Sequence, residues 1–313
     1  MKTKLKVSVI QIDGKIPNLA LMKIAAHYQS NGHEVIRYIS GDVDKAFISV
    51  IWPKNLNKAI GISKFFNGNC VIGGSGYNYK IKLPEDIEHI MPAYDLWNID
   101  YSIGFTSRGC IRNCDFCIVP KKEGHIRANA SISEFLSPNH KKLLLLDNNL
   151  LAAPNWKQTL NEIKDLGLMA SFNQGLDIRL INDENAKLLS EIDYRNGKFH
   201  DKYLYFSFDD IQNEKAIRNG IKILFDHGFT GRNLFFYLLV GFNSTFEDDY
   251  KRYLILWEEF GAYPFVMIYN NRRDDERIRA FARWVNRRIH KSCSWEDYNR
   301  NPDFVKEVER CNQ

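Results

Sequence analysis

The sequence has no long apolar segment and no signal of export. No stretch reaches the ~18 consecutive apolar residues that a membrane-spanning helix needs. The start, MKTKLKVSVIQIDG, lacks the long apolar run and the cleavage site of a signal peptide. Hydrophobic residues make up 44% and charged residues 26%, a balance typical of globular proteins and not of disordered chains. We therefore expect a cytoplasmic protein with no membrane partner.

Cysteine is also scarce, with six in 313 residues, which excludes a disulfide framework. Three of them, Cys110, Cys114 and Cys117, lie together in SRGCIRNCDFCIVP. Such a cluster predicts metal ligands in a reducing compartment. Zinc sites usually combine two separated ligand pairs, and the sequence offers no second pair. Three thiolates from one loop can instead hold three irons of a [4Fe–4S] cluster and leave the fourth iron open.

The first 98 residues alternate strand and helix patterns. Residues 5–12 predict a buried strand, and the apolar positions of NLALMKIAAHYQSNG follow helical spacing. EVIRYIS, AFISVIW and CVIGG predict further strands, and KAIGISKFF predicts a second helix. We therefore expect residues 1–98 to form a small, doubly wound, flavodoxin-like domain with a parallel sheet, followed by a connector.

The alternation resumes over residues 99–270 with longer spacing. Strand candidates are DYSIGFT, LLLLD, ASFNQGLDIRL, YLYFSF, LFFYLLVGF and PFVMIY, with amphipathic segments between them. Six strand–helix repeats predict a partial (β/α)6 barrel, in which functional residues gather at the C-terminal ends of the strands. The cysteine cluster directly follows the first of these strands. Residues 271–313 predict an arginine-rich helical extension.

The cysteine segment resembles the radical S-adenosylmethionine (SAM) enzymes, whose motif is CxxxCxΦC with Φ aromatic. Cys110, Cys114, Phe116 and Cys117 match it position by position. The resemblance implies that the three cysteines bind a [4Fe–4S] cluster and that SAM binds its open iron. An electron then cleaves SAM to a 5′-deoxyadenosyl radical that modifies a substrate. It further implies a reducing partner, such as a flavodoxin or ferredoxin, and packing of Phe116 against adenine. A structural zinc site is the competing interpretation.

The resemblance also places SAM contacts near the ends of the second and third barrel strands. LLLLDNNLL stands where many members have glycine-glycine-glutamate, and Asp147 and Asn149 would accept from the SAM ammonium group or cap a turn. In SFNQGLDIRL, Gln174, Asp177 and Arg179 lie near an expected strand end, with the last two on one strand face. Arg179 would bind the SAM carboxylate, or form a structural ion pair with Asp177.

Two later strands supply further candidates. Ser207 in YFSFDD would contact ribose hydroxyls or the methionine end of SAM, although a turn beginning at the aspartates explains the segment equally well. Gly241 in LLVGFNSTFEDD lets the backbone approach a ligand closely, and the family often binds adenine near this strand. The same segment is also typical of an ordinary helix that begins at Thr245.

The first domain resembles the cobalamin-binding-type domain that precedes the radical core in one branch of the family. The matching features are a helix ending in Gly-His-Glu-Val and the turn at Gly73 and Gly74. The Asp-x-His-x-x-Gly signature is absent, so bound cobalamin is not the favoured interpretation. By analogy, the domain order implies methyl or methylthio transfer to a small molecule, RNA or peptide.

The C-terminal extension predicts a docked amphipathic helix. One stripe is apolar: Ile278, Phe281, Val285 and Ile289. Another face carries a row of arginines: Arg279, Arg283 and Arg287. The row would bind RNA phosphates, or would be solvated and paired with nearby acids. Two non-enzymatic interpretations therefore remain open, a zinc or iron–sulfur binding protein and an RNA-binding module.

Overall fold

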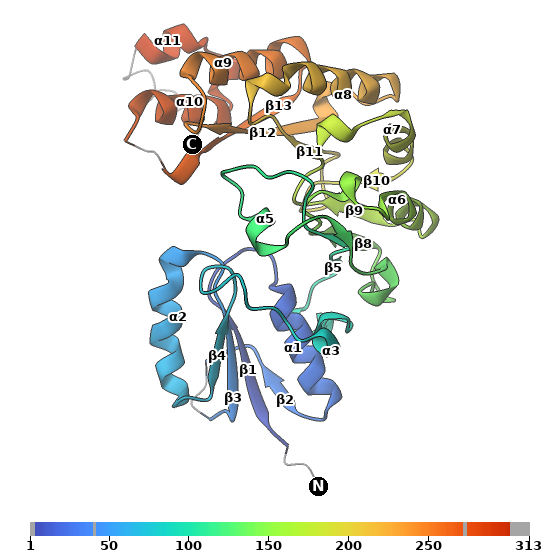
Figure 1. The fold of residues 1–313 in the computed structure, drawn as a ribbon, viewed down its shortest axis with the longest axis vertical. Helices are drawn as coiled ribbons and strands as arrows, with labels where there is room; N and C mark the ends of the chain where they lie inside the picture. Colours follow the sequence, from blue (N-terminus) through green and yellow to red (C-terminus); the bar gives the residue numbers. More distant parts are fainter. Residues whose placement is uncertain (1–3, 40–41, 272–273, 301–313) are drawn as a thin grey trace. The chain divides into compact units, whose positions relative to one another are not determined.

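The computed structural model describes residues 4–39, 42–271 and 274–300. The chain divides into two compact units, the first formed by residues 1–112 and 118–147 and the second by residues 113–117 and 148–313. Both units are α/β and contain parallel strands (Figure 1). Among the described helices, none combines the length and the hydropathy needed to cross a bilayer. The three-part division at residues 98 and 270 remains a prediction.

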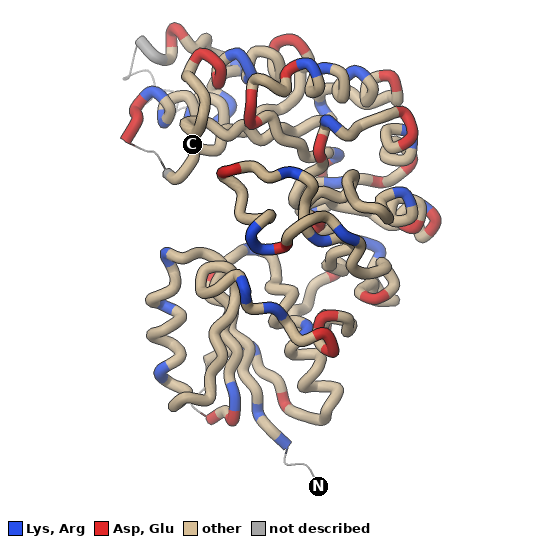
Figure 2. Tube along the Cα trace, viewed as in Figure 1, with Lys and Arg blue, Asp and Glu red and all other residues tan. Residues whose placement is uncertain are grey.

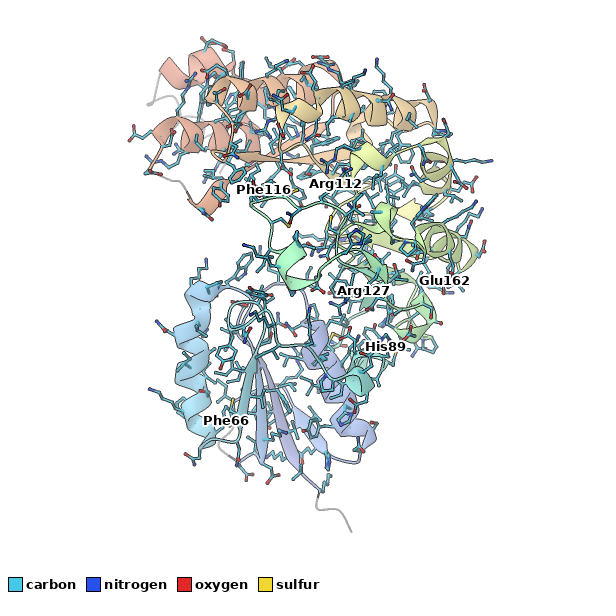
Figure 3. The ribbon with its side chains drawn as sticks, viewed as in Figure 1. Phe66, His89, Arg112, Phe116, Arg127 and Glu162 are labelled. Atoms are coloured by element: carbon cyan, nitrogen blue, oxygen red, sulfur yellow. The ribbon has the colours of Figure 1, made fainter. Side chains whose placement is uncertain are left out.

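The first unit begins with a four-stranded parallel sheet of order β2–β1–β3–β4. Its strands are β1 (Lys6–Gln11), β2 (Glu34–Ile36), β3 (Lys45–Ser49) and β4 (Cys70–Gly73). Helix α1 (Leu19–Ser30) joins β1 to β2, and α2 (Leu56–Ser63) lies between β3 and β4. Phe66 after α2, labelled in Figure 3, is buried in the same apolar cluster as Ile48 of β3. The strand order is that of a flavodoxin-like sheet, as predicted.

The rest of the first unit leads into the cysteine segment and out of it. It contains the short helices α3 (Glu85–Glu88), α4 (Tyr94–Trp97) and α5 (Val119–Lys122). Its strands are β5 (Ser102–Gly104), β6 (Ser107–Arg108), β7 (Arg127–Ala128) and β8 (Lys142–Leu145). Strands β5 and β8 pair in parallel, whereas β6 and β7 form a short antiparallel pair that the sequence did not predict.

The second unit contains two groups of parallel strands. Strand β9 (Met169–Phe172) pairs with β10 (Asp193–Tyr194), and β11 (Leu204–Ser207), β12 (Leu234–Val240) and β13 (Tyr263–Ile268) form a sheet in that order. Its helices include α6 (Trp156–Asp165), α7 (Asp183–Ser190), α8 (Glu214–Asp226) and α9 (Phe246–Leu254). Basic and acidic residues are interspersed along α8 and α9 (Figure 2), so these helices carry mixed charge.

The strand predicted across ASFNQGLDIRL is shorter than expected. It ends at Phe172, and a 3-10 helix forms over Ile178–Leu180 with Asp177 as its N-cap. Between them Gly175 has φ +87°, and a Cβ there would lie 3.1 Å from the carbonyl oxygen of Tyr205. The prediction that Asp177 and Arg179 share one strand face is therefore wrong, because the chain turns before it reaches them.

The C-terminal helix docks as predicted. Helix α10 (Glu276–Asn286) buries the apolar stripe, including Phe281 at 0% exposure, and Ile289 lies in the following 3-10 turn. Arg279 faces outward and pairs with Glu276 at 3.3 Å. Helix α11 (Trp295–Arg300) follows. The polar tail and Cys311 lie outside the described residues.

Candidate functional site

The cysteine loop is closed at its base inside the first unit. Strands β6 and β7 pair Ser107 with Ala128 and Arg108 with Arg127. The amide of Cys110 donates to the carbonyl oxygen of Gly124 at 3.2 Å. Gly109, with φ +87°, allows this approach, because a Cβ there would lie 2.4 Å from the carbonyl oxygen of His125. The sequence from Cys110 to Gly124 therefore projects from a fixed hairpin base.

Asp147 anchors the segment that enters this hairpin. Its carboxylate accepts four hydrogen bonds, from the amide and hydroxyl of Thr106 at 3.1 and 2.7 Å and from those of Ser107 at 2.6 Å each. Only 4% of Asp147 is exposed, and burial raises the pKa of its carboxyl although these bonds oppose the shift. The described partners of Asp147 are thus the residues that lead into the cysteine loop.

Replacing Asp147 with alanine should destabilise the first unit by roughly 2–4 kcal/mol, because it removes four hydrogen bonds at a dry site. It should also lower iron loading, since Thr106 and Ser107 set the base of the loop. Urea denaturation and iron analysis measure both effects. Asp100→Ala is the matched control, because Asp100 is exposed and makes a surface ion pair with Lys142. Equal stability of the two variants would contradict this role of Asp147.

A buried network of ion pairs holds Arg108, the residue that follows Ser107. Its guanidinium bonds Glu88, lies 3.6 Å from Glu123 and stacks on Phe105 at 3.8 Å. Glu88 also pairs with Lys23 of α1 at 3.2 Å. Burial alone would raise the pKa of Glu88, but the charges of Arg108 and Lys23 hold it below its usual range. The network thereby links the first sheet's helix to the residue two positions before Cys110.

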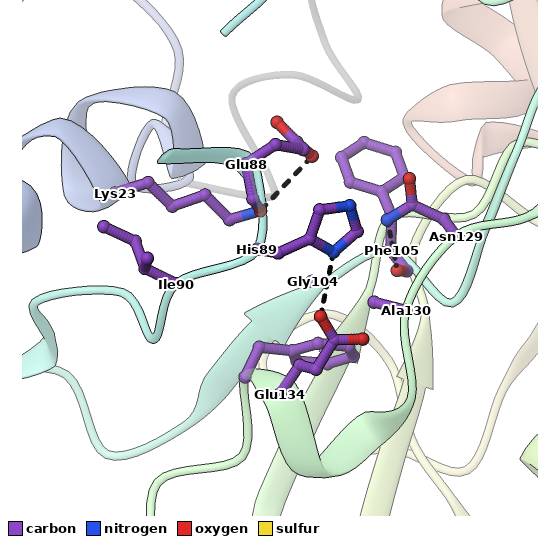
Figure 4. A pocket seen from close by; sticks show the side chains of 10 residues that line it. Lys23, Glu88, His89, Ile90, Gly104, Phe105, Asn129, Ala130 and Glu134 are labelled. Carbon is purple, nitrogen blue, oxygen red and sulfur yellow. Dashed lines mark hydrogen bonds and ion pairs between the residues drawn. The ribbon is translucent and has the colours of Figure 1, made fainter. Parts of the chain in front are cut away.

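A small charged pocket lies beside this network, inside the first unit (Figure 4). Lys23 and Glu88 line it together with His89, whose Nδ1 lies 2.8 Å from a carboxylate oxygen of Glu134. Burial lowers the pKa of Lys23, although Glu88 partly offsets the shift. These charged groups are paired with one another, which favours a structural role for the pocket.

The three cysteine thiols are all half-buried. The chain leaves the first unit after Arg112 and returns at Ile118, so Cys110 belongs to the first unit and the other two to the second. The amide of Arg112 donates to Cys110 Sγ at 3.3 Å. In the second unit, the amide of Cys117 donates to the carbonyl oxygen of Cys114 at 2.9 Å.

The donor chemistry of this loop fits a cubane cluster. Within the described residues, no three His, Cys, Asp or Glu side chains form a group that could hold a metal ion. A cubane binds each thiolate to a different iron, so it requires thiolates that stand further apart than the ligands of a single ion. The three half-buried thiols match such a cluster in the number and chemistry of the protein ligands that it needs.

The aromatic residue of the motif packs on a strand end within the second unit. The ring of Phe116, labelled in Figure 3, lies 5.5 Å from that of Phe242, edge to face, and the ring of Phe242 lies 4.8 Å from that of Tyr269. Phe242 directly follows Gly241, which is buried and has φ +73°. The structure thus brings Phe116 and Gly241 to the same end of β12. The sequence did not identify Phe242, although an aromatic directly after a strand-end glycine could have indicated it.

Charged candidates converge in the same unit. Arg179 bonds Asp177 through Nε at 2.7 Å and Nη2 at 3.0 Å, and Asn149 Nδ2 lies 3.5 Å from the second oxygen of Asp177. Burial lowers the pKa of Arg179, but the bonds and charge of Asp177, with smaller effects from Cys114 and Asp209, raise it overall. An ion pair between these residues was one of the two interpretations of the segment, and its geometry arises from the 3-10 helix.

Asp209 is an additional charged group at this place. It accepts from the amide of Leu239 at 3.2 Å and hydrogen-bonds the hydroxyl of Ser207. Burial raises its pKa, whereas the charges of Arg252 and Arg179 oppose the shift. Ser207 therefore has a carboxylate neighbour, and Gln174, by contrast, is exposed on the turn after β9.

The loops at the carboxyl ends of the first sheet bond to one another through their polar groups. Gln11 Nε2 bonds the carbonyl oxygens of Asp13, Gly14 and Ile16, and the carboxylate of Asp13 accepts from the amides of Ile51 and Trp52. Gly74 packs so closely that a Cβ would lie 2.3 Å from Val50 O. The loops contain no histidine. Their polar groups hydrogen-bond within and between the loops, and Gly74 allows two loops to pack closely.

No family model, curated protein or solved structure matches this chain.

Proposed function

We propose that this protein is a radical SAM enzyme in which Cys110, Cys114 and Cys117 hold a [4Fe–4S] cluster. The observation that carries the proposal is the CxxxCxΦC loop, because its base is fixed by the β6–β7 pair and by Asp147. When bound, the cluster supplies the electron that cleaves SAM and so starts hydrogen abstraction from the substrate. A flavodoxin or ferredoxin in the cytoplasm is the proposed reductant.

The residues of the second unit support a SAM-binding role. A guanidinium has five N–H donors, of which Arg179 uses two for Asp177, so others are available for the SAM carboxylate. Asn149 and Asp177 offer oxygen acceptors for the ammonium group. Adenine would pack between the ring of Phe116 and the backbone at Gly241, an assignment supported by the contact of Phe116 with Phe242, the residue after that glycine. Ser207 is suited to the ribose hydroxyls.

The finer architecture belongs to the same proposal. We assign residues 99–270 to a partial (β/α)6 barrel, which the parallel pairing of β5 with β8 and of β11, β12 and β13 supports. The candidate residues then occupy the C-terminal strand ends, as in other barrels of this kind. Methyl or methylthio transfer remains the proposed reaction class, on domain order alone.

The test is anaerobic reconstitution of the full chain with iron and sulfide, followed by electron paramagnetic resonance of the dithionite-reduced protein. The proposal predicts [4Fe–4S] loading and a signal that changes when SAM is added, because SAM binds the open iron. A chain that takes up zinc in preference to iron, or a cluster whose signal is indifferent to SAM, would instead indicate a non-catalytic metal-binding protein.

A further inference from the structure

The sheet β11–β12–β13 has one buried face and one aromatic face. Every second residue of β12 is buried, and those between are half-buried. The pairing register places Tyr205, Phe235 and Tyr263 in one row across the three strands. Ser207, Tyr237 and Phe265 form the next row, and Leu239 and Met267 the third. We call these rows the aromatic face.

The rings of the aromatic face contact one another as a continuous surface. Phe235 lies 5.2 Å from Tyr205 and 6.0 Å from Phe265, and Tyr237 lies 6.0 Å from Phe265. Exposure is greatest on the edge strand β13, where Phe265 is 37% and Met267 47% exposed. The opposite face is closed, since Phe236 and Leu238 are both 0% exposed. Solvent therefore reaches the aromatic face from the β13 side.

This face leads to the candidate SAM residues. Its second row ends at Ser207, and the amide of Leu239 in the third row bonds Asp209. Beyond the ends of β12 and β13, Phe242 contacts both Tyr269 and Phe116. A molecule lying on the aromatic face would thus extend to the place where we propose that SAM is cleaved.

Two exposed cations border the other end of the face. Arg288, in a left-handed turn with φ +61°, lies 5.9 Å from the centre of the Tyr263 ring, and Lys291 Nζ lies 5.3 Å from it. Both follow α10 and are separate from the arginine row on its outer side. The combination is a sheet of aromatic rings with positive charge at its margin.

We propose that the aromatic face binds a nucleobase-bearing substrate, with Phe265 and Tyr263 stacking on bases and with Arg288 and Lys291 contacting phosphate. This inference rests on the proposed function, whose substrate class it names. Aromatic rings on a sheet surface are a general solution for binding unpaired bases, because every base presents a flat π-face. An uncharged aromatic ligand would use the rings but would not require the two cations, so the pair favours a phosphorylated ligand.

The test is fluorescence anisotropy with a labelled, short single-stranded oligouridylate and the full chain. Phe265→Ser should weaken binding by roughly tenfold or more, because it removes a stacking ring. In the Arg288→Gln/Lys291→Gln double variant, the slope of log K against log salt should fall by about 1.4, that is, by about 0.7 for each phosphate that is no longer neutralised. Competition with uridine monophosphate distinguishes a free nucleotide from a single strand as the source of the base, and either result supports the assignment.

Two matched variants control for general effects. Phe65 is an exposed aromatic of the first unit, at 67%, and Arg279 lies on the outer face of α10. Phe65→Ser and Arg279→Gln should leave binding unchanged. Loss of binding in Arg279→Gln with no loss in Phe265→Ser would overturn the proposal, as would absence of binding to both probes.

Binding of the oligonucleotide requires neither cluster nor SAM, so this test fails separately from that of the proposed function. A Cys114→Ala chain should bind the oligonucleotide as the wild type does. A wild-type chain that cleaves SAM but binds neither probe would overturn the nucleobase assignment alone.

Discussion

Alanine at Cys110, Cys114 or Cys117, one at a time, should abolish both cluster loading and SAM cleavage. Each thiolate anchors a different iron, so the loss of one leaves an iron without its protein ligand. The fold should survive, because the β6–β7 pair and Asp147 hold the base of the loop without using any thiol. Iron and sulfide analysis measures loading, and thermal denaturation measures the fold.

Two other cysteines provide the control for this experiment. Cys70 and Cys293 are also half-buried thiols, and burial raises the pKa of both. They lie far from the motif in sequence, so Cys70→Ala and Cys293→Ala should load iron as the wild type does. Iron loss in these variants, or normal loading in the three loop variants, would show that the loop does not hold the cluster.

Asp249→Asn should destabilise the second unit by roughly 3–5 kcal/mol, because it leaves the charge of Arg252 buried without its partner. Arg252 is 0% exposed and Asp249 1% exposed. The guanidinium bonds Asp249, the carbonyl oxygen of Phe208 and, at 2.8 Å, that of Leu239. It thereby joins α9 to the ends of β11 and β12. Urea denaturation measures the loss.

A comparison of Asp249→Asn with Asp248→Asn separates the effect of the buried charge from that of the helix cap. Asp248 is the less buried neighbour, at the surface end of the helix cap that it forms with Thr245, so Asp248→Asn should cost far less. The Asp249→Leu/Arg252→Met double variant should recover part of the loss, because it removes both charges together. Arg252→Met should also raise the pKa of Asp209, since the charge of Arg252 opposes the effect of burial there. If Asp249→Asn and Asp248→Asn are equally stable, the pair does not matter.

The parallel strands and the docked helix could be predicted because local patterns determine them. The apolar run of β8, which includes Leu145, predicts a buried strand from the local sequence alone. The alternation of buried and half-buried residues in β12 does the same. The prediction that the apolar stripe from Ile278 to Ile289 is buried is likewise confirmed. The region after Phe172 could not be predicted in this way. Leu176 and Ile178 alternate with polar residues as in a strand, yet Leu176 N bonds Tyr205 O from a turn. Only the distant strand β11 supplies that partner.

The sequence predicted the cysteine motif of the candidate site, but it did not predict the residues that hold the motif in place. The motif from Cys110 to Cys117 can be recognised without a structure, because all three cysteines lie in one segment of the sequence. By contrast, Asp147 meets Thr106 and Ser107 across about forty residues, and Glu88 meets Arg108 across twenty. Such pairings depend on how the chain returns, which no local pattern encodes. Arg252 was missed for the same reason, since an isolated arginine in a helix usually faces solvent.

The proposed function requires that this chain cleave SAM at a cluster held by its cysteine loop. The most direct test is 5′-deoxyadenosine production by the anaerobically reconstituted, dithionite-reduced chain with SAM, compared with Cys114→Ala and Cys70→Ala. We expect 5′-deoxyadenosine from the wild type and from Cys70→Ala, and none from Cys114→Ala. A fully loaded wild-type chain that forms no 5′-deoxyadenosine, or a Cys114→Ala chain that forms as much as the wild type, would contradict it.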